Sequence, residues 1–195
     1  MVTIINYNAG NVQSVKFALE RLEVQAELTD DPETIRSADK VIFPGVGEAA
    51  NTMAYLKAKG LDQLIRSLKQ PVLGICLGMQ LLCEHSEEAD TTCLGIITQR
   101  VKRFISTKPD IKVPHMGWNA IQQTELGWFD PSVDQQYVYF VHSYYVEKGE
   151  YTSALCNYIH PFSAALQKDN FFATQFHPEK SGSVGETILQ SFLKI

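Results

Sequence analysis

The sequence has few cysteines, and their spacing fits neither a disulfide scaffold nor a metal-binding motif. The four cysteines are Cys76, Cys83, Cys93 and Cys156, and no two of them have C-x-x-C spacing. A disulfide-stabilised fold needs a denser and more regular set. The five histidines form no H-E-x-x-H or H-x-H pair, so we expect no metal site. These absences predict free thiols in a reducing compartment.

Long apolar runs and an excess of positive charge are also missing. No apolar stretch has the roughly 18 residues that a membrane-spanning helix needs, and residues 1–6 lack the basic region of a signal peptide. The net charge is -5, and the lysines and arginines are scattered along the chain. A basic surface for nucleic acid or anionic membrane is therefore excluded. We expect a cytoplasmic, unprocessed protein that binds neither partner.

The sequence does have the composition of an ordinary globular enzyme. With 195 residues, 45% of them hydrophobic, it suits one domain spanning residues 1–195. Strand-like and helical segments alternate in the first half, which predicts an α/β fold with a mostly parallel central sheet. From about residue 95 the chain is richer in strands. The expected strands are 2–7, 24–28, 40–43, 71–75, 137–146, 152–159, 162–166 and 171–176, and the expected helices are 12–22, 49–59, 61–68 and 184–193, with a short one starting near Pro32.

A Gly-x-Cys-x-Gly motif over residues 74–78 lies between a predicted strand and a predicted helix. This is the pattern of a nucleophile elbow, with cysteine in place of serine. The glycines permit a sharp reversal that exposes the Cys76 sulfur and leaves the Leu77 N–H free to bind an oxyanion. A cysteine considered alone is more often a core residue. In this context, however, the motif favours a nucleophile.

A candidate base follows the last predicted strand, in the segment Gln-Phe-His-Pro-Glu over residues 175–179. Alternate side chains of an extended segment share a face, so His177 and Glu179 can point the same way. The carboxylate would then fix the imidazole tautomer and turn the other ring nitrogen toward the sulfur. His-Pro-Glu alone is common in loops. Combined with the elbow, it predicts Cys76, His177 and Glu179 as a catalytic triad.

A third segment, Gly45, Val46 and Gly47, follows a predicted strand and Pro44. Its glycines let a backbone N–H approach a bound carbonyl, so with Leu77 it could form an oxyanion hole. The segment also fits a loose dinucleotide-binding fingerprint. That interpretation is disfavoured because Pro44 precedes it and no acidic residue ends a following strand at the required distance. On this evidence alone, a plain tight turn explains the segment as well as a functional loop does.

Together these three segments resemble class I glutamine amidotransferases, over nearly the whole chain. Three further stretches resemble one branch of that family, the glutaminase subunits of imidazole glycerol phosphate synthase. They are Pro-His-Met-Gly-Trp-Asn at 114–119, Tyr-Phe-Val-His-Ser-Tyr at 139–144 and His-Pro-Glu-Lys-Ser at 177–181. The first of these is the most specific. The resemblance implies a flavodoxin-like sandwich with a β-rich C-terminal half.

The resemblance also implies roles for individual residues. Cys76 attacks the glutamine side-chain amide, and His177 protonates the departing ammonia and later activates water. The residues implied in oxyanion and glutamine binding are Gly45, Val46, Gly47, Leu77, Gln80, His142, Ser143 and Tyr144. No cofactor is implied. The ammonia passes to a separate (β/α)8-barrel subunit of a heterodimer, which makes imidazole glycerol phosphate and an aminoimidazole carboxamide ribotide in histidine biosynthesis.

The partner interface and the alternatives depend on weaker signals. The resemblance implies Asn11, Trp118, Tyr139 and Lys180 at the interface, although Asn11 also suits a helix N-cap and Trp118 a core position. The glutamates at 84, 87 and 88 are interpreted as a solvated cluster rather than a site. Anthranilate or pyridoxal phosphate synthase glutaminases, a stand-alone cysteine hydrolase and a catalytically silent binding module remain alternatives.

Overall fold

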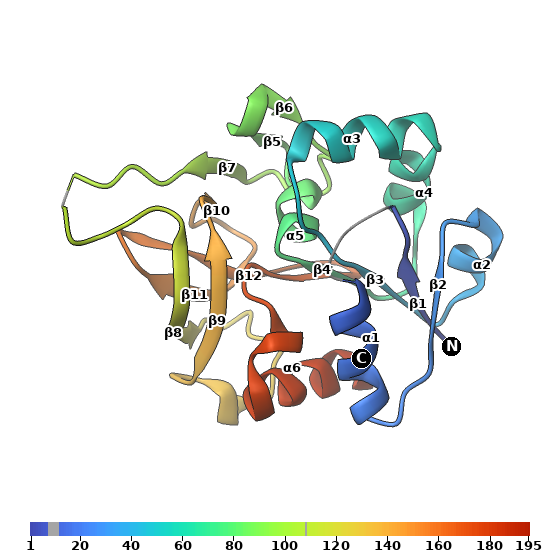
Figure 1. Cartoon of the computed structure of the whole chain (residues 1–195). Coiled ribbons are helices and arrows are strands. Elements are labelled where there is room, and N and C mark those ends of the chain that lie inside the picture. The colour runs from blue at the N-terminus through green and yellow to red at the C-terminus, as the bar shows by residue number, and fades with distance from the viewer. Residues whose placement is uncertain (8–11, 108) are drawn as a thin grey trace.

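The computed structural model describes residues 1–7, 12–107 and 109–195. Its centre is a block of parallel strands in the spatial order β2, β1, β3, β4 and β13 (Figure 1). Their bounds are β1 Val2–Ile5, β2 Ala26–Thr29, β3 Lys40–Phe43, β4 Val72–Ile75 and β13 Phe171–Thr174. This arrangement confirms the predicted mostly parallel central sheet.

Helices cover both faces of this block. One face carries α1 and α6, and the other carries α3, α4 and α5 (Figure 1). The helices are α1 Val12–Arg21, α2 Pro32–Ser37, α3 Ala49–Ala58, α4 Leu61–Ser67, α5 Leu77–Leu82 and α6 Gly182–Lys194. Ile42 and Leu73 pair in register and face α1 and α6, whereas Val41 and Val72 face the other layer. Burial on both faces explains why the strand sequences are apolar throughout.

The C-terminal half extends the sheet with mostly antiparallel strands. β12 pairs with β13, β10 and β11, β11 pairs with β8, and β8 pairs with β9. The strands outside the parallel block are β5 His85–Ser86, β6 Thr91–Thr92, β7 Arg100–Arg103, β8 His115–Gln123, β9 Tyr137–His142, β10 Tyr144–Val146, β11 Thr152–Asn157 and β12 Pro161–Lys168. The expected hairpin is present as β12 and β13. The expected single strand over 137–146 was wrong, because Ser143 separates β9 from β10.

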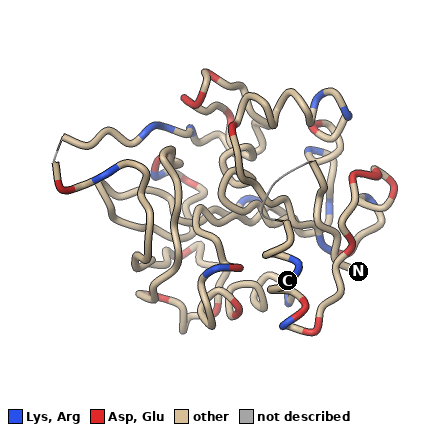
Figure 2. The backbone as a smooth tube through the Cα atoms, in the orientation of Figure 1, with Lys and Arg blue, Asp and Glu red and all other residues tan. Residues whose placement is uncertain are grey.

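A second core fills the space between these antiparallel strands and α6. It is rich in aromatic rings, and Phe140, Phe162 and Phe176 in it are fully buried. Lysine and arginine positions are interspersed with aspartate and glutamate positions along the described chain (Figure 2). Among the described residues, no helix is both long and apolar enough to span a membrane.

Candidate active site

The predicted nucleophile lies at the junction of β4 and α5 in a strained backbone conformation. Cys76 has φ 54° and ψ -109°, and the helix begins at Leu77. A positive φ is uncommon for a residue other than glycine and is typical of a nucleophile elbow. The Cys76 N–H donates to the Thr174 carbonyl at 2.7 Å, which ties the elbow to β13. As the first helical residue, Leu77 has an N–H without a partner inside the helix, and Leu77 lines the cavity beside Cys76.

The 44–47 segment packs backbone to backbone against this elbow. A Cβ atom at Gly78 would lie 2.0 Å from the Phe43 carbonyl oxygen, and one at Gly45 would lie 2.3 Å from the Gly78 nitrogen. Both positions therefore require glycine. The Tyr7 hydroxyl donates to the Pro44 carbonyl, and burial, with Cys76 nearby, raises the pKa of Tyr7. The segment is thus held beside the nucleophile by close packing and one buried hydrogen bond.

The predicted base and its carboxylate partner are in contact and buried. His177 Nδ1 lies 2.7 Å from Glu179 Oε1, and the two residues are 1% and 8% exposed. This contact confirms the predicted one, but the expectation of an extended backbone through residue 179 was wrong. His177 is extended, but Pro178–Lys180 form the 3₁₀ helix η3, because Pro178 occupies its first turn. The Ser181 hydroxyl donates to the His177 carbonyl at 2.6 Å and stabilises this turn.

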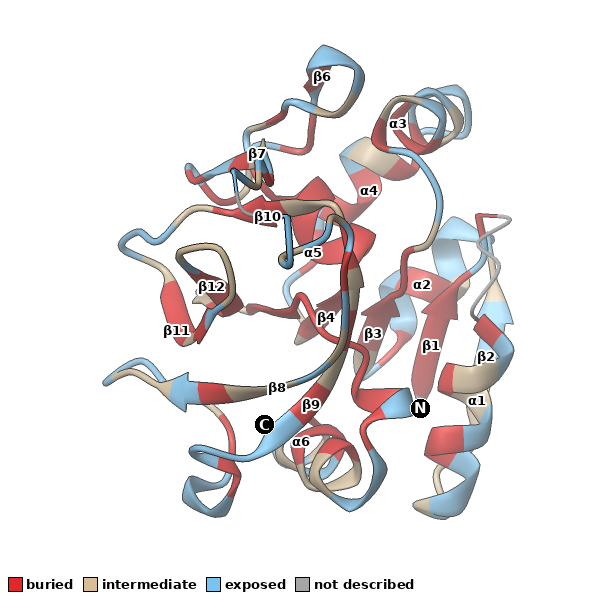
Figure 3. Cartoon of the chain, turned by 60° about the vertical axis from the view of Figure 1, so that its left-hand side comes forward, coloured by how far each residue is buried: buried red, intermediate tan, exposed pale blue. Residues whose placement is uncertain are grey.

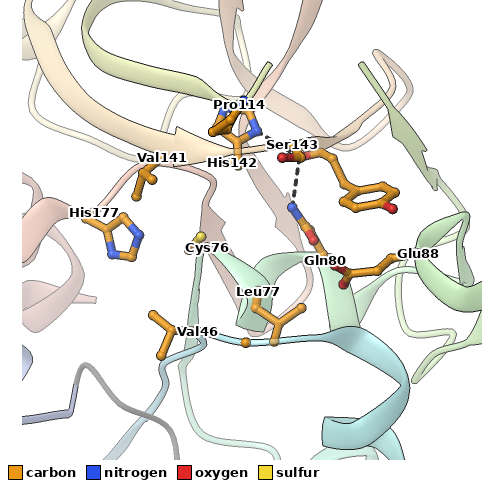
Figure 4. Close-up of a pocket in the computed structure, with 12 residues that line it drawn as sticks. Val46, Cys76, Leu77, Gln80, Glu88, Pro114, Val141, His142, Ser143 and His177 are labelled. Carbon is orange, nitrogen blue, oxygen red and sulfur yellow. Dashed lines mark hydrogen bonds between the residues drawn. The ribbon is translucent and has the colours of Figure 1, made fainter. Parts of the chain in front are cut away.

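The ionisation of His177 is set by its two partners. Burial lowers the pKa of His177, but hydrogen bonds to Cys76 and Glu179 and the charges of both groups outweigh it and raise the pKa from 6.5 to about 10. The other ring nitrogen faces Cys76 (Figure 4). At neutral pH the ring is therefore protonated, and it lies between the Cys76 sulfur and the Glu179 side chain.

A cavity of about 360 Å³ opens in front of these residues. Its lining includes Cys76, His177 and all but one of the other residues predicted to bind the oxyanion and glutamine, namely Val46, Gly47, Leu77, Gln80, His142, Ser143 and Tyr144 (Figure 4). Gly45 lies outside the lining, because it packs beneath Gly78. The volume suits a ligand the size of an amino acid.

Glu88 also lines this cavity, and the interpretation of it as part of a solvated cluster was wrong. It lies in the 3₁₀ helix η1 (Glu88–Asp90), which packs against α3. Its Oε2 accepts the Ala49 N–H at 2.8 Å. Burial is the main cause that raises the pKa of Glu88. No pattern in the sequence indicated this position, because the neighbouring glutamates at 84 and 87 made the segment look uniformly exposed.

His142 is held neutral rather than poised as a second base. Its Nδ1 lies 2.7 Å from the Tyr144 carbonyl, and its Nε2 lies 3.0 Å from His115 Nδ1. Burial is the main cause that lowers the pKa of His142 to about 3, and burial lowers that of His115 to about 4. Because the Tyr144 carbonyl can only accept, the proton of neutral His142 is on Nδ1, and His115 donates to Nε2.

Of the residues predicted at a partner interface, Trp118 and Tyr139 lie on the outer face of β8 and β9. Trp118 is 55% exposed and contacts Tyr139, with ring centroids 6.1 Å apart. Lys180 is exposed on η3. Asn11 lies outside the described residues. In the described ranges, no group of three or more His, Cys, Asp and Glu side chains is placed to hold a metal ion.

Comparison with known sequences gives matches over the full length. The profile of the family Glutamine amidotransferase class-I matches residues 3–195. A Bacteroides thetaiotaomicron protein named imidazole glycerol phosphate synthase subunit HisH is 59% identical over 194 residues, covering 100% of this chain and 99% of that protein. The subunit of the same name from Idiomarina loihiensis is 47% identical over 196 residues, covering 100% and 97%.

Comparison with solved structures shows the same fold at low sequence identity. A crystal structure described as a glutamine amidotransferase superposes with a TM-score of 0.76 at 18% identity, covering 100% of this chain and 98% of that one. A structure described as PurLQS from Thermotoga maritima gives a TM-score of 0.66 at 16% identity, covering 99% and 97%.

Proposed function

The chain belongs to the Glutamine amidotransferase class-I family and, within it, to the imidazole glycerol phosphate synthase subunits HisH, and from this premise we propose how its residues act. Cys76, His177 and Glu179 hydrolyse glutamine to glutamate and ammonia, and a separate synthase subunit consumes the ammonia. The observation that carries this proposal is the strained Cys76 beside a buried His177 and Glu179 pair at the edge of a cavity. Residues 1–195 act as one glutaminase domain.

In the first step, the Cys76 thiolate attacks the side-chain carbonyl carbon of glutamine. The N–H of Leu77 and that of Val46 or Gly47 stabilise the oxyanion that forms. The C–N bond then breaks, and the departing ammonia takes the proton of the His177 imidazolium. A γ-glutamyl thioester on Cys76 remains, and His177 is neutral.

In the second step, neutral His177 takes a proton from water as the water oxygen attacks the thioester. When the C–S bond breaks, its electron pair returns to sulfur, and glutamate leaves. Glu179 stays ionised throughout, fixing the tautomer of His177 and stabilising its charged form. The site ends as it began, with a thiolate beside an imidazolium.

Charge complementarity supports glutamine as the ligand of the cavity. The α-ammonium group of an amino acid needs a negative partner, and the Glu88 carboxylate lines the cavity on the far side of Gln80 from Cys76 (Figure 4). We assign Glu88 to this group. The Gln80 Oε1 and the Ser143 backbone then form hydrogen bonds with the remaining polar atoms of the substrate.

The outer face of β8 and β9 is the proposed docking surface for a (β/α)8-barrel synthase subunit. The register pairs Met116 with Val141 and Trp118 with Tyr139, so these side chains share one face. Met116 and Trp118 are exposed, and Figure 3 shows that exposed and intermediate stretches alternate with buried ones along β8. The Tyr139 carbonyl accepts the His177 N–H at 3.0 Å. A partner bound here would lie next to the site where ammonia is released.

The relatives are named as subunits of imidazole glycerol phosphate synthase. We propose that the barrel subunit uses the ammonia to make imidazole glycerol phosphate, with an aminoimidazole carboxamide ribotide as the second product. This is a step of histidine biosynthesis. The proposal locates the enzyme in the cytoplasm, where its four buried free cysteines stay reduced.

The test is glutamate release from glutamine by the purified chain, alone and with a HisH-partner barrel subunit. We expect turnover that rises with the barrel and falls by more than about a thousandfold in Cys76→Ala. Cys83→Ala, which removes another buried thiol from the same helical region, is the matched control and should retain activity. Turnover that survives in Cys76→Ala would overturn the proposal.

A further inference from the structure

The Cys76 sulfur has a second polar neighbour besides His177. The side-chain nitrogen of Gln175 lies 3.7 Å from Cys76 Sγ, and Gln175 is fully buried. Its backbone is fixed, because the Gln175 N–H donates to the Ala164 carbonyl at 2.8 Å. Among the described residues, the cavity lining includes Cys76 and His177 but not Gln175. Gln175 therefore approaches the sulfur from behind the cavity wall.

A chain of hydrogen bonds determines which end of the Gln175 amide faces the sulfur. The Tyr144 carbonyl can only accept, and it lies 2.9 Å from Gln80 Nε2. The same nitrogen lies 2.9 Å from Gln175 Oε1. The Gln80 amide thus uses its two N–H bonds on two acceptors, which turns the Gln175 oxygen toward Gln80. The Gln175 NH₂ group is left pointing at Cys76.

The carbonyl at the start of this chain is itself fixed by a buried, neutral histidine. His142 donates from Nδ1 to the Tyr144 carbonyl and accepts from His115. The His115 ring is stacked between Tyr158 and Phe140, with centroids 4.0 and 4.7 Å away. The orientation of Gln175 therefore depends on a rigid aromatic core rather than on solvent.

We propose that Gln175 is a further catalytic residue, whose amide N–H stabilises the Cys76 thiolate, and that Gln80, the Tyr144 carbonyl and His142 act as positioning groups that orient it. The inference rests on the proposed role of Cys76 as the nucleophile. The sulfur is negatively charged before attack and again when the thioester breaks, and an N–H bond to an ionised acceptor is stronger than a neutral one. His177 loses its proton during the cycle, whereas an amide does not. Gln175 is thus a donor that the sulfur keeps throughout.

The test is the rate at which iodoacetamide alkylates Cys76 at neutral pH without glutamine, followed by mass spectrometry of the Cys76 peptide. Gln175→Met keeps the length of the side chain but cannot donate, so alkylation should slow roughly tenfold or more. Gln175→Glu still accepts from Gln80 but faces the sulfur with a negative oxygen, and it should slow alkylation further. If Gln175→Met does not fold, this isosteric variant still tests whether the Gln175 N–H stabilises the Cys76 thiolate.

Gln99→Met is the matched control, because Gln99 is also a buried amide, whose nitrogen donates to the Glu147 carbonyl at 2.6 Å. It should alkylate like the unmodified chain. In the assembled enzyme, the Gln175 variants should lose kcat for glutamine with little change in KM, because Gln175 lies outside the cavity lining. Alkylation in both folded Gln175 variants as fast as in the control would overturn the inference. Slowed alkylation without glutaminase activity in any mixture would instead count against the proposed function alone.

Discussion

The four cysteines show how the surroundings of a residue decide its chemistry. Burial is the main cause that raises the pKa of Cys93 to about 11 and that of Cys156 to about 12, and it also raises that of Cys83. These three side chains stay protonated thiols. Cys76 instead lies beside a protonated imidazole and an amide donor at the mouth of a cavity. The reactivity that we propose for Cys76 depends on these neighbours and not on cysteine as such.

At this scale, the buried histidines His115 and His142 predict that the folded chain loses stability in mild acid. The pKa values of His115 and His142 are near 4 and 3 in the folded chain, below their ordinary value of 6.5. The contribution of neutral His115 and His142 to the free energy of unfolding is therefore complete above pH 6.5. It declines as the pH falls toward 4, because these histidines bind protons at higher pH in the unfolded chain than in the folded one. We expect the urea midpoint to fall over this range. The urea midpoint should fall less steeply with pH in His142→Asn. An equal slope in the variant and the unmodified chain would contradict the conclusion that buried His142 is neutral.

The grouping of Cys76, His177 and Glu179 could be predicted from the sequence, because the three residues lie in short motifs whose spacing reflects local backbone geometry. Glu88 and Gln175 could not. Glu88 reaches the cavity because η1 packs on α3, and Gln175 reaches the sulfur through contacts with residues about 95 and 99 positions away in the chain. Long-range contacts of this kind leave no pattern in a single sequence.

Among the elements, the parallel strands were the easiest to predict and the polar strands the hardest. Buried strands such as β3 and β4 are continuous apolar runs, which a sequence shows directly. β8 was not predicted, because its nine residues contain glycine, asparagine and two glutamines and one face is exposed. The break at Ser143 was also missed, since apolar residues continue on both sides of it. That break places Ser143 in the cavity wall.

The contact between the elbow and the end of β3 gives a prediction for Gly78. Its added Cβ would meet the Phe43 carbonyl, a backbone atom that cannot move aside easily. Gly78→Ala should lower the free energy of unfolding by about 1–3 kcal/mol and abolish glutaminase activity by displacing the 44–47 segment. Urea unfolding and glutamate release measure the two effects.

Gly60→Ala is the control, because Gly60 has φ 68° and open space around it. It should cost about 1–2 kcal/mol of strain and leave the activity of the folded chain intact. Full activity in Gly78→Ala would show that the 44–47 segment does not need this contact.

For the whole molecule, the main feature is that the exposed face of β8 and β9 is directly connected to the site. β9 carries Val141 into the cavity lining, and its Tyr139 carbonyl accepts the His177 N–H. A partner on this face would therefore contact the strand that holds the base in place. This arrangement gives the proposed synthase subunit a short physical route to the glutaminase site.

Trp118 is the residue through which this surface can be tested. Trp118→Ala should weaken binding of the barrel subunit by about 2 kcal/mol or more, as expected for a central aromatic contact, without changing the fold. Leu126→Ala, which removes another exposed apolar side chain outside β8 and β9, should bind normally. Calorimetric titration gives both affinities. Equal affinities for the two variants would place the interface elsewhere.

The central claim is that Cys76 is the nucleophile of a glutamine site, and labelling with an electrophilic diazoketone analogue of glutamine tests it most directly. Peptide mass spectrometry should find the label on Cys76, with Cys83, Cys93 and Cys156 unmodified, and excess glutamine should prevent the labelling. Label on another cysteine, or labelling of Cys76 that glutamine does not prevent, would contradict the account.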